Sequence, residues 1–142
     1  MTTKEVYESI RVLVLEDEGH IRQIICSLLR QLGFRHIHEA SDGGEGFKEL
    51  VRVRPEVVLC DIHMKPVDGR QFLKMVRTVK VEWVKNIPII FLTADANPDT
   101  VAFAKEFQIN GYLVKPVSVN DLKARIDSVL KTLDRSAHAQ GL

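Results

Sequence analysis

The sequence lacks an excess of charge, a disulfide-forming set of cysteines and any long hydrophobic run. It has only two cysteines, and both lie in apolar patterns typical of inert core thiols rather than of a zinc site. No apolar run approaches the ~20 residues of a membrane-spanning helix, and the N-terminus lacks a signal-peptide core. The formal net charge is +1, with basic residues scattered along the chain. We therefore expect a cytoplasmic protein that binds neither membrane nor nucleic acid directly.

The length and the hydrophobic content predict one domain with its own core. The chain has 142 residues, of which 45% are hydrophobic, and this leaves no room for a second domain of ordinary size. Residues 1–9 are predicted to form a polar N-terminal leader. Residues 134–142 are polar and small, which is typical of a flexible C-terminal tail. The folded domain is expected to span residues 10–133.

Strand-like and helix-like patterns alternate five times within this domain. The apolar runs that predict buried strands are Val12–Leu15, Val57–Cys60, Ile89–Leu92 and Tyr112–Val114. Residues 34–40 form a more polar run, as expected for a strand at the edge of a sheet. Alternation of this kind, with nearly continuous apolar strands, predicts an α/β fold. We expect a doubly wound parallel sheet of five strands with helices on both faces.

Polar side chains follow the predicted strands at the point where each strand ends. Asp61 closes the third strand, the pair Glu16-Asp17 follows the first, Thr93 follows the fourth, and Lys115 follows the last. Read singly, these acids are typical of a solvated turn or helix cap, and the lysine of an exposed surface. Because the carboxyl ends of parallel strands meet at one edge, we expect the side chains to converge.

Convergence of three carboxylates has a chemical consequence. Carboxylates that lie close together repel, so either their pKa values rise or a cation joins them. Mg²⁺ suits such a site because it prefers carboxylate, water and phosphate oxygens. An aspartate can accept a phosphoryl group as an acyl phosphate, a reaction that depends on positioning and on neutralisation of charge. The sequence therefore predicts a Mg²⁺-dependent phosphoryl-acceptor site centred on Asp61, with Lys115 and Thr93 as donors.

These motifs resemble those of the receiver domain of two-component response regulators. The resemblance rests on the acidic pair Glu16-Asp17, on Asp61 in a D-x-x-M-x-P-x-D-G pattern, on Thr93-Ala94 and on Tyr112-x-x-Lys115-Pro116. It spans about residues 10–133, and the chain is similar to single-domain chemotaxis regulators in being nearly all receiver. The resemblance implies a flavodoxin-like strand order of 2-1-3-4-5.

The resemblance also implies a role for each site residue. It implies that Asp61 is the phospho-acceptor and that Lys115 and Thr93 bind the phosphoryl oxygens. Tyr112 is implied to be the switch residue, which turns inward when Thr93 moves. The implied Mg²⁺ ligands are Glu16, Asp17, Asp61 and the backbone carbonyl of His63.

Two positions depart from the family pattern. Lys65 stands where the family usually has proline, and Pro66 follows one place later. This difference affects the loop after Asp61. Glu16 stands where aspartate is common, which lengthens one ligand side chain but keeps its charge.

The implied partners are a histidine kinase or histidine phosphotransfer protein upstream, and a protein target on the face near residues 99–133. The chain would then be a signalling switch that catalyses only its own phosphorylation and dephosphorylation. One alternative is a magnesium-dependent aspartyl-phosphate phosphatase, but such enzymes carry an acid two residues after the nucleophile, where this chain has His63. A second alternative is a phosphorylation-independent scaffold, against which the intact Asp61, Thr93 and Lys115 argue.

Overall fold

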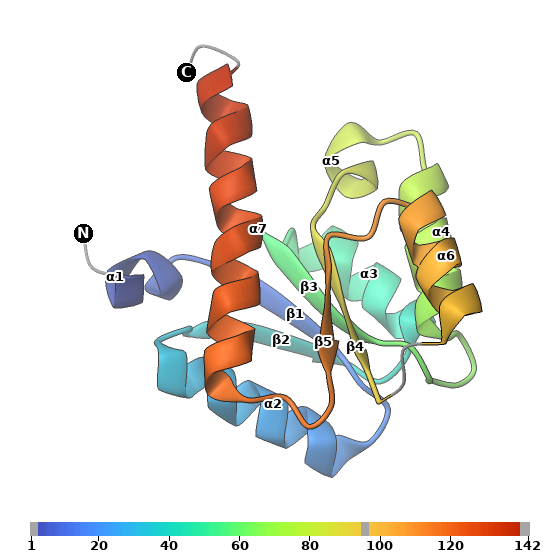
Figure 1. Ribbon diagram of the computed structural model, residues 1–142, viewed down its shortest axis with the longest axis horizontal. Coiled ribbons are helices and arrows are strands. Elements are labelled where there is room, and N and C mark those ends of the chain that lie inside the picture. Colours follow the sequence, from blue (N-terminus) through green and yellow to red (C-terminus); the bar gives the residue numbers. More distant parts are fainter. Residues whose placement is uncertain (1–2, 95–96, 140–142) are drawn as a thin grey trace.

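The fold is organised around one parallel sheet. The computed structural model describes residues 3–94 and 97–139, with the backbone alone for residue 3 and residues 132–139. Five strands lie in the order β2-β1-β3-β4-β5, and every neighbouring pair is parallel (Figure 1). The strands are β1 (Arg11–Leu15), β2 (His36–Ala40), β3 (Val57–Asp61), β4 (Ile89–Thr93) and β5 (Gly111–Val114). The predicted sheet and its strand order are confirmed.

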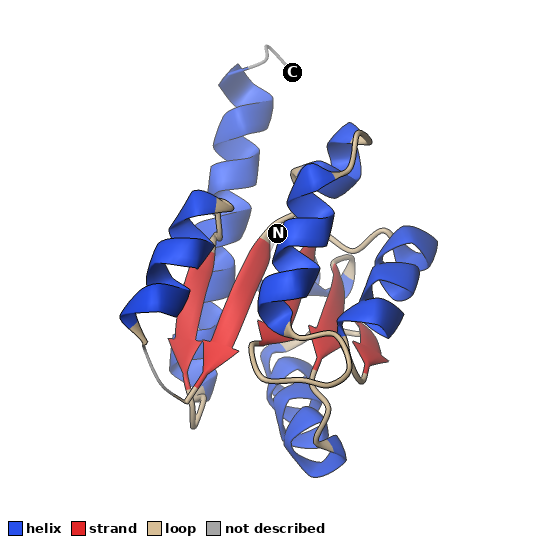
Figure 2. Ribbon diagram, turned by 90° about the vertical axis from the view of Figure 1, so that its right-hand side faces the viewer, coloured by secondary structure: helices blue, strands red, loops and turns tan. Residues whose placement is uncertain are grey.

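Helices cover both faces of this sheet (Figures 1 and 2). They are α1 (Thr3–Glu8), α2 (Gly19–Leu32), α3 (Gly43–Val53), α4 (Gly69–Thr78), α5 (Glu82–Lys85), α6 (Pro98–Glu106) and α7 (Val119–Ala139). Helices α2 and α7 pack on one face, whereas α3, α4, α5 and α6 cover the other. Successive strand residues point to opposite faces, so Val12 and Val14 join the first cluster while Leu13 and Leu15 join the second. Burial on both faces explains why the central strands are apolar throughout.

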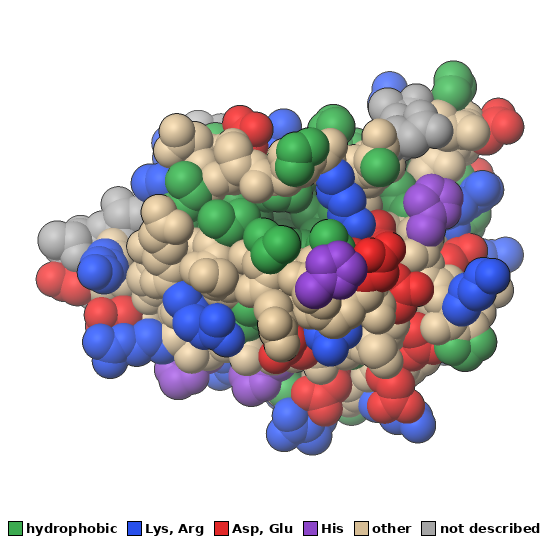
Figure 3. Space-filling model, turned by 90° about the horizontal axis from the view of Figure 1, so that it is seen from below, with side chains coloured by type: hydrophobic (Ala, Val, Ile, Leu, Met, Phe, Trp, Pro, Cys, Tyr) green, Lys and Arg blue, Asp and Glu red, His purple; other side chains and the backbone are tan. Residues whose placement is uncertain are grey.

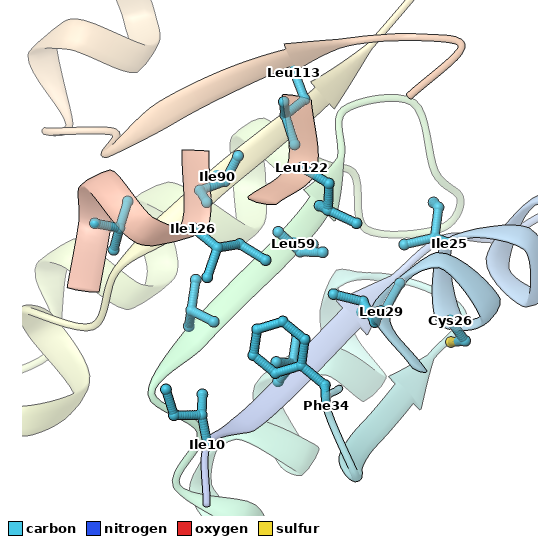
Figure 4. Close-up of a cluster of buried hydrophobic side chains, with 14 of the residues drawn as sticks. Ile10, Ile25, Cys26, Leu29, Phe34, Leu59, Ile90, Leu113, Leu122 and Ile126 are labelled. Atoms are coloured by element: carbon cyan, nitrogen blue, oxygen red, sulfur yellow. The ribbon is translucent and has the colours of Figure 1, made fainter. Parts of the chain in front are cut away.

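The core between the sheet and helices α2 and α7 is formed by regularly spaced aliphatic side chains. Ile25 and Leu29 in α2, and Leu122 and Ile126 in α7, are each four residues apart, which places each pair on one face of its helix. All four belong to the same buried cluster as Leu59 of the central strand β3 (Figure 4). Full burial of each such side chain stabilises the fold by about 1.5–3 kcal/mol.

The N-terminal segment, predicted to be a polar leader over residues 1–9, contains helix α1 and packs on the domain through one side chain. Tyr7 in α1 is only 1% exposed, and its ring stacks on that of Phe34 with centroids 4.2 Å apart. The Tyr7 hydroxyl donates a hydrogen bond to Asp127 of α7. Burial, together with this carboxylate, raises the pKa of Tyr7. One buried aromatic ring thus anchors an otherwise polar segment to the core.

The last helix is longer than predicted. Helix α7 continues to Ala139, past the expected end of the domain at residue 133. Residues 134–139 contain neither glycine nor proline, so the local sequence offers no residue that usually ends a helix. The rest of the predicted tail lies outside the described residues. Within the described ranges, no helix is both long and apolar enough to span a membrane.

Candidate functional site

The predicted site residues meet at one edge of the sheet. Asp61 and Thr93 are the last residues of β3 and β4, Glu16 directly follows β1, and Lys115 directly follows β5. Strand β3 lies between β1 and β4, so Asp61 lies at the centre of this edge. The backbone N–H of Lys115 donates to the carbonyl oxygen of Thr93 over 2.7 Å. Parallel strands thus bring four chemically active residues together, as their positions at strand ends indicated.

Three carboxylates form the acidic part of the site. Glu16, Asp17 and Asp61 each place an oxygen within 4.8 Å of the others. Glu16 is 1% exposed and Asp61 is 5% exposed, whereas Asp17 is open to solvent. The Nζ atom of Lys115 lies 3.1 Å from Glu16 Oε1 and 3.2 Å from Asp61 Oδ1. The ammonium group therefore bridges the two buried carboxylates and offsets part of their repulsion.

The electrostatics of this cluster favour a further cation. Burial and the neighbouring Asp61 raise the pKa of Glu16 to about 8, although Lys115 acts in the opposite direction. Burial disfavours the charge of Lys115, but the attraction of Asp61 and Glu16 outweighs it and raises the pKa of the amine. In the described part of the chain, Glu16 Oε2 is buried without a hydrogen-bond partner. A buried carboxylate oxygen in this position is costly unless the group is protonated or binds a cation. The residues present therefore fit Mg²⁺.

Two further predicted residues extend from the site toward α6. Thr93 is 1% exposed, whereas Tyr112 on the adjacent strand is half-buried. The ring of Tyr112 meets that of Phe91 edge-on, with centroids 6.0 Å apart. The Tyr112 hydroxyl donates to the carbonyl oxygen of Thr100 in α6 over 3.5 Å. Tyr112 thus links β5 to α6, close in sequence to the strand end that carries Lys115.

The loop between β3 and α4 carries His63 and Lys65, and both side chains are exposed. The peptide bond between Lys65 and Pro66 is cis, as is that between Lys115 and Pro116. His63 follows Asp61 by two residues, and the contact of its backbone carbonyl with a metal ion stays a prediction.

Gly69, the first residue of α4, is a determinant of the site that the sequence argument did not identify. Its N–H donates to the carbonyl oxygen of Ile62 over 2.8 Å, and a Cβ atom at this position would lie 2.5 Å from the carbonyl oxygen of Asp61. Asp68 and Gln71 form a capping box at the start of the helix. Only glycine permits so close an approach. The Asp68-Gly69 pair therefore supports the backbone of Asp61 as well as starting α4.

An apolar groove of about 310 Å³ borders the site. Its lining residues come from α2 and from the segment after β5, and they are Ile21, Ile24, Ile25, Leu28, Lys115, Pro116 and Val117. Figure 3 views the face below α2 in Figure 1 and shows hydrophobic side chains gathered beside acidic, basic and histidine side chains. Since Lys115 lines the groove and also contacts Asp61, the apolar surface is continuous with the acidic site.

Comparison with known proteins agrees with this geometry. Residues 12–127 match the response regulator receiver domain family. The chain is 31% identical over 126 residues to chemotaxis protein CheY-3 of Vibrio cholerae, a match that covers 89% of this chain and 95% of that protein. It is 34% identical over 128 residues to a probable chemotaxis protein CheY of Rhizobium etli, covering 90% and 98%. The solved structure of a putative response regulator from Chloroflexus aurantiacus is similar with a TM-score of 0.78 at 25% identity, covering 86% and 98%.

Proposed function

Because the chain belongs to the response regulator receiver domain family and is a phosphorylation-activated signalling switch, we propose that Asp61 accepts the phosphoryl group. The observation that carries this proposal is the ammonium group of Lys115, 3.2 Å from Asp61 Oδ1 at the centre of the sheet edge. A cation in this position can neutralise charge on the oxygens of a transferred phosphoryl group. The neighbouring carboxylates of Glu16 and Asp17 follow the adjacent strand β1 and would bind a metal ion beside Asp61.

The proposed reaction is a transfer of the phosphoryl group from a histidine to an aspartate. An oxygen of Asp61 forms a bond to phosphorus while the bond between phosphorus and the histidine nitrogen of the donor breaks. The electron pair of the broken bond stays on the histidine, and the product is an acyl phosphate. The Lys115 ammonium group and the Thr93 hydroxyl would bind the phosphoryl oxygens. The proposed donor is a histidine kinase or a histidine phosphotransfer protein, and its support is that receiver domains interact with histidine kinases.

The acidic cluster is proposed to hold Mg²⁺. Receiver domains generally bind this ion at an acidic pocket, and Glu16, Asp17 and Asp61 would supply its ligands here, together with the backbone carbonyl of His63. The support from this chain is the buried, unpartnered Oε2 atom of Glu16 and the short separation of the three carboxylates. The bound ion would offset the negative charge that otherwise opposes the approach of a phosphoryl donor.

Mass spectrometry tests the acceptor assignment. Wild-type protein incubated with a small acyl phosphate donor is expected to gain one phosphoryl group, and to gain it only in the presence of Mg²⁺. Asp61→Asn is expected to gain none. Asp99→Asn, which alters an exposed carboxylate in α6, is the control and should react like wild type. Phosphorylation of Asp61→Asn at the wild-type rate would exclude Asp61 as the acceptor.

The comparisons support neither of the alternatives that the sequence left open. The two relatives named above are chemotaxis proteins, and the matching family is that of receiver domains. A scaffold that works without phosphorylation would not need the bridging contacts of Lys115. That the chain catalyses only its own phosphorylation and dephosphorylation stays a prediction, as do its cytoplasmic location and the absence of direct nucleic-acid binding.

We further propose that the downstream target binds the face formed by α6, β5 and α7, near residues 99–133. This face has a hollow of about 350 Å³ whose lining includes Tyr112, Val114, Asp121 and Arg125. Val114 is 62% exposed, which is unusual for a strand residue of this apolar type. On phosphorylation the Thr93 hydroxyl would move to bond a new phosphoryl oxygen, and Tyr112 would fill the space that it leaves. Because Tyr112 contacts α6, the change would reach the target surface.

A further inference from the structure

Arg22, in the first turn of α2, holds the backbone of the acidic turn after β1. Its Nη1 atom donates to the carbonyl oxygen of Glu16 over 2.6 Å, and its Nε atom donates to Glu39 Oε1 on β2 over 3.0 Å. The backbone N–H of Glu16 donates to the carbonyl oxygen of Ala40 over 3.1 Å. Both backbone polar groups of Glu16 are therefore fixed to neighbouring elements. The planar guanidinium group can hold two acceptors at once, which an ammonium group on a flexible chain does much less well.

The carboxylates of the turn have few restraints of their own. Lys115 contacts Glu16 through Oε1, while the Oε2 atom has no hydrogen-bond partner in the described chain. The side chain of Asp17 is exposed and makes no hydrogen bond or ion pair with any described residue. The directions of these two carboxylates therefore depend on the backbone that carries them. Arg22 is the side chain that fixes this backbone.

We propose that Arg22 is a positioning residue for the Mg²⁺ ligands. Its guanidinium group, oriented by Glu39, sets the backbone of Glu16 and thereby aims the carboxylates of Glu16 and Asp17 at the ion. This inference rests on the proposed function, because it assumes that these acids bind Mg²⁺. If Arg22 acted only through its charge, its removal would change the Mg²⁺ affinity in the opposite direction. The positive charge of Arg22 repels Mg²⁺, so its loss would tighten Mg²⁺ binding.

The sign of the change in Mg²⁺ affinity decides between the two roles. Mg²⁺ itself is titrated calorimetrically into each variant at a pH above the pKa of Glu16. Loss of groups that orient metal ligands typically weakens affinity 10–100-fold, so Arg22→Ala is expected to bind Mg²⁺ about tenfold more weakly than wild type. Arg22→Lys keeps the charge but not the two-acceptor geometry, and it should also bind more weakly. At saturating Mg²⁺ both variants should regain the wild-type rate of phosphorylation, because Arg22 acts through the ion.

Arg52→Ala is the matched control, because Arg52 makes a similar two-contact pair with Glu49 but no contact with the acidic turn. It should bind Mg²⁺ like wild type. Unchanged or tighter binding in both Arg22→Ala and Arg22→Lys would overturn the positioning role. If Arg22→Ala does not fold, Arg22→Lys and Glu39→Gln replace it in the test. Weaker Mg²⁺ binding in both supports the positioning role, and unchanged or tighter binding in both overturns it.

Variants of the ligands themselves separate this inference from the proposed function. Asp17→Asn and Glu16→Gln should lose Mg²⁺ affinity if the acidic cluster is the metal site. Wild-type affinity in these variants would refute the site and the inference together. Loss of affinity in them, combined with normal affinity in the Arg22 variants, would refute the inference alone.

Discussion

Replacing Lys115 by alanine is expected to destabilise the metal-free protein by about 3 kcal/mol. The ammonium group lies 3.1 Å from Glu16 Oε1 and 3.2 Å from Asp61 Oδ1, and both carboxylates are buried. Breaking a buried ion pair by removing one partner costs ~3–5 kcal/mol. We take the lower end, because the Lys115 side chain is 23% exposed and solvent screens part of its charge.

Mg²⁺ should compensate for most of this loss. A ligand at a hundred times its dissociation constant stabilises the folded state by about 2.7 kcal/mol. Lys115→Ala with Mg²⁺ should therefore be about as stable as wild type without it. The ammonium group is not among the proposed ligands and its charge repels Mg²⁺, so its removal should not weaken Mg²⁺ binding while it impairs the response to phosphorylation.

Urea unfolding followed by circular dichroism, in chelator and in Mg²⁺, measures both effects. Lys48→Ala is the control, because Lys48 forms an exposed pair with Glu45 at 3.5 Å, and such pairs contribute ~0–1 kcal/mol. Equal stability of Lys115→Ala and Lys48→Ala in chelator would show that the ammonium group does not stabilise the buried carboxylates. Loss of Mg²⁺ binding in Lys115→Ala as complete as in Asp17→Ala would show that Lys115 is needed for the metal site.

Three further predictions concern the site and its output. The pKa of Glu16 is raised to about 8 from 4.5. At a pH between these two values, the folded metal-free protein therefore carries a proton on Glu16 that the unfolded chain lacks. Its urea midpoint should therefore rise as the pH falls from about 8, and Glu16→Gln should lose this rise. Gly69→Ala should slow phosphorylation by about a hundredfold because it displaces the backbone of Asp61, whereas Gly44→Ala, with its nearest neighbour at 3.7 Å, should react normally. Tyr112→Ala should accept phosphate yet show no change in amide exchange of α6 with a stable phosphoryl mimic; wild-type changes in this variant would exclude Tyr112 as the switch.

The sheet and the convergence of the site were predictable because both depend on local patterns. Apolar runs marked the buried strands, and a polar residue at the end of each run marked the edge where they meet. The edge position of β2 followed from its polarity, which the structure confirms with His36 and Glu39 exposed. Topology alone then brought Glu16, Asp61 and Lys115 together.

The features that the sequence did not reveal depend on contacts between distant segments. Tyr7 lies in a polar stretch, and its burial depends on Phe34 and on Asp127, which is 120 residues away. Gly69 is typical of a turn in sequence, and its steric role appears only when α4 lies against the backbone of Asp61. Arg22 is an ordinary charged residue on a helix until Glu39 of β2 is placed beside it.

The most direct test of the account is chemical identification of the phosphorylated residue. Borohydride reduces an acyl phosphate to an alcohol, which converts a phosphorylated aspartate to homoserine. The protein is phosphorylated with a small acyl phosphate donor and Mg²⁺, reduced, digested and mapped by mass spectrometry. We predict homoserine at position 61 alone, and none when Mg²⁺ is omitted. Homoserine at position 17, or an unmodified Asp61 in protein that has taken up phosphate, would contradict the account.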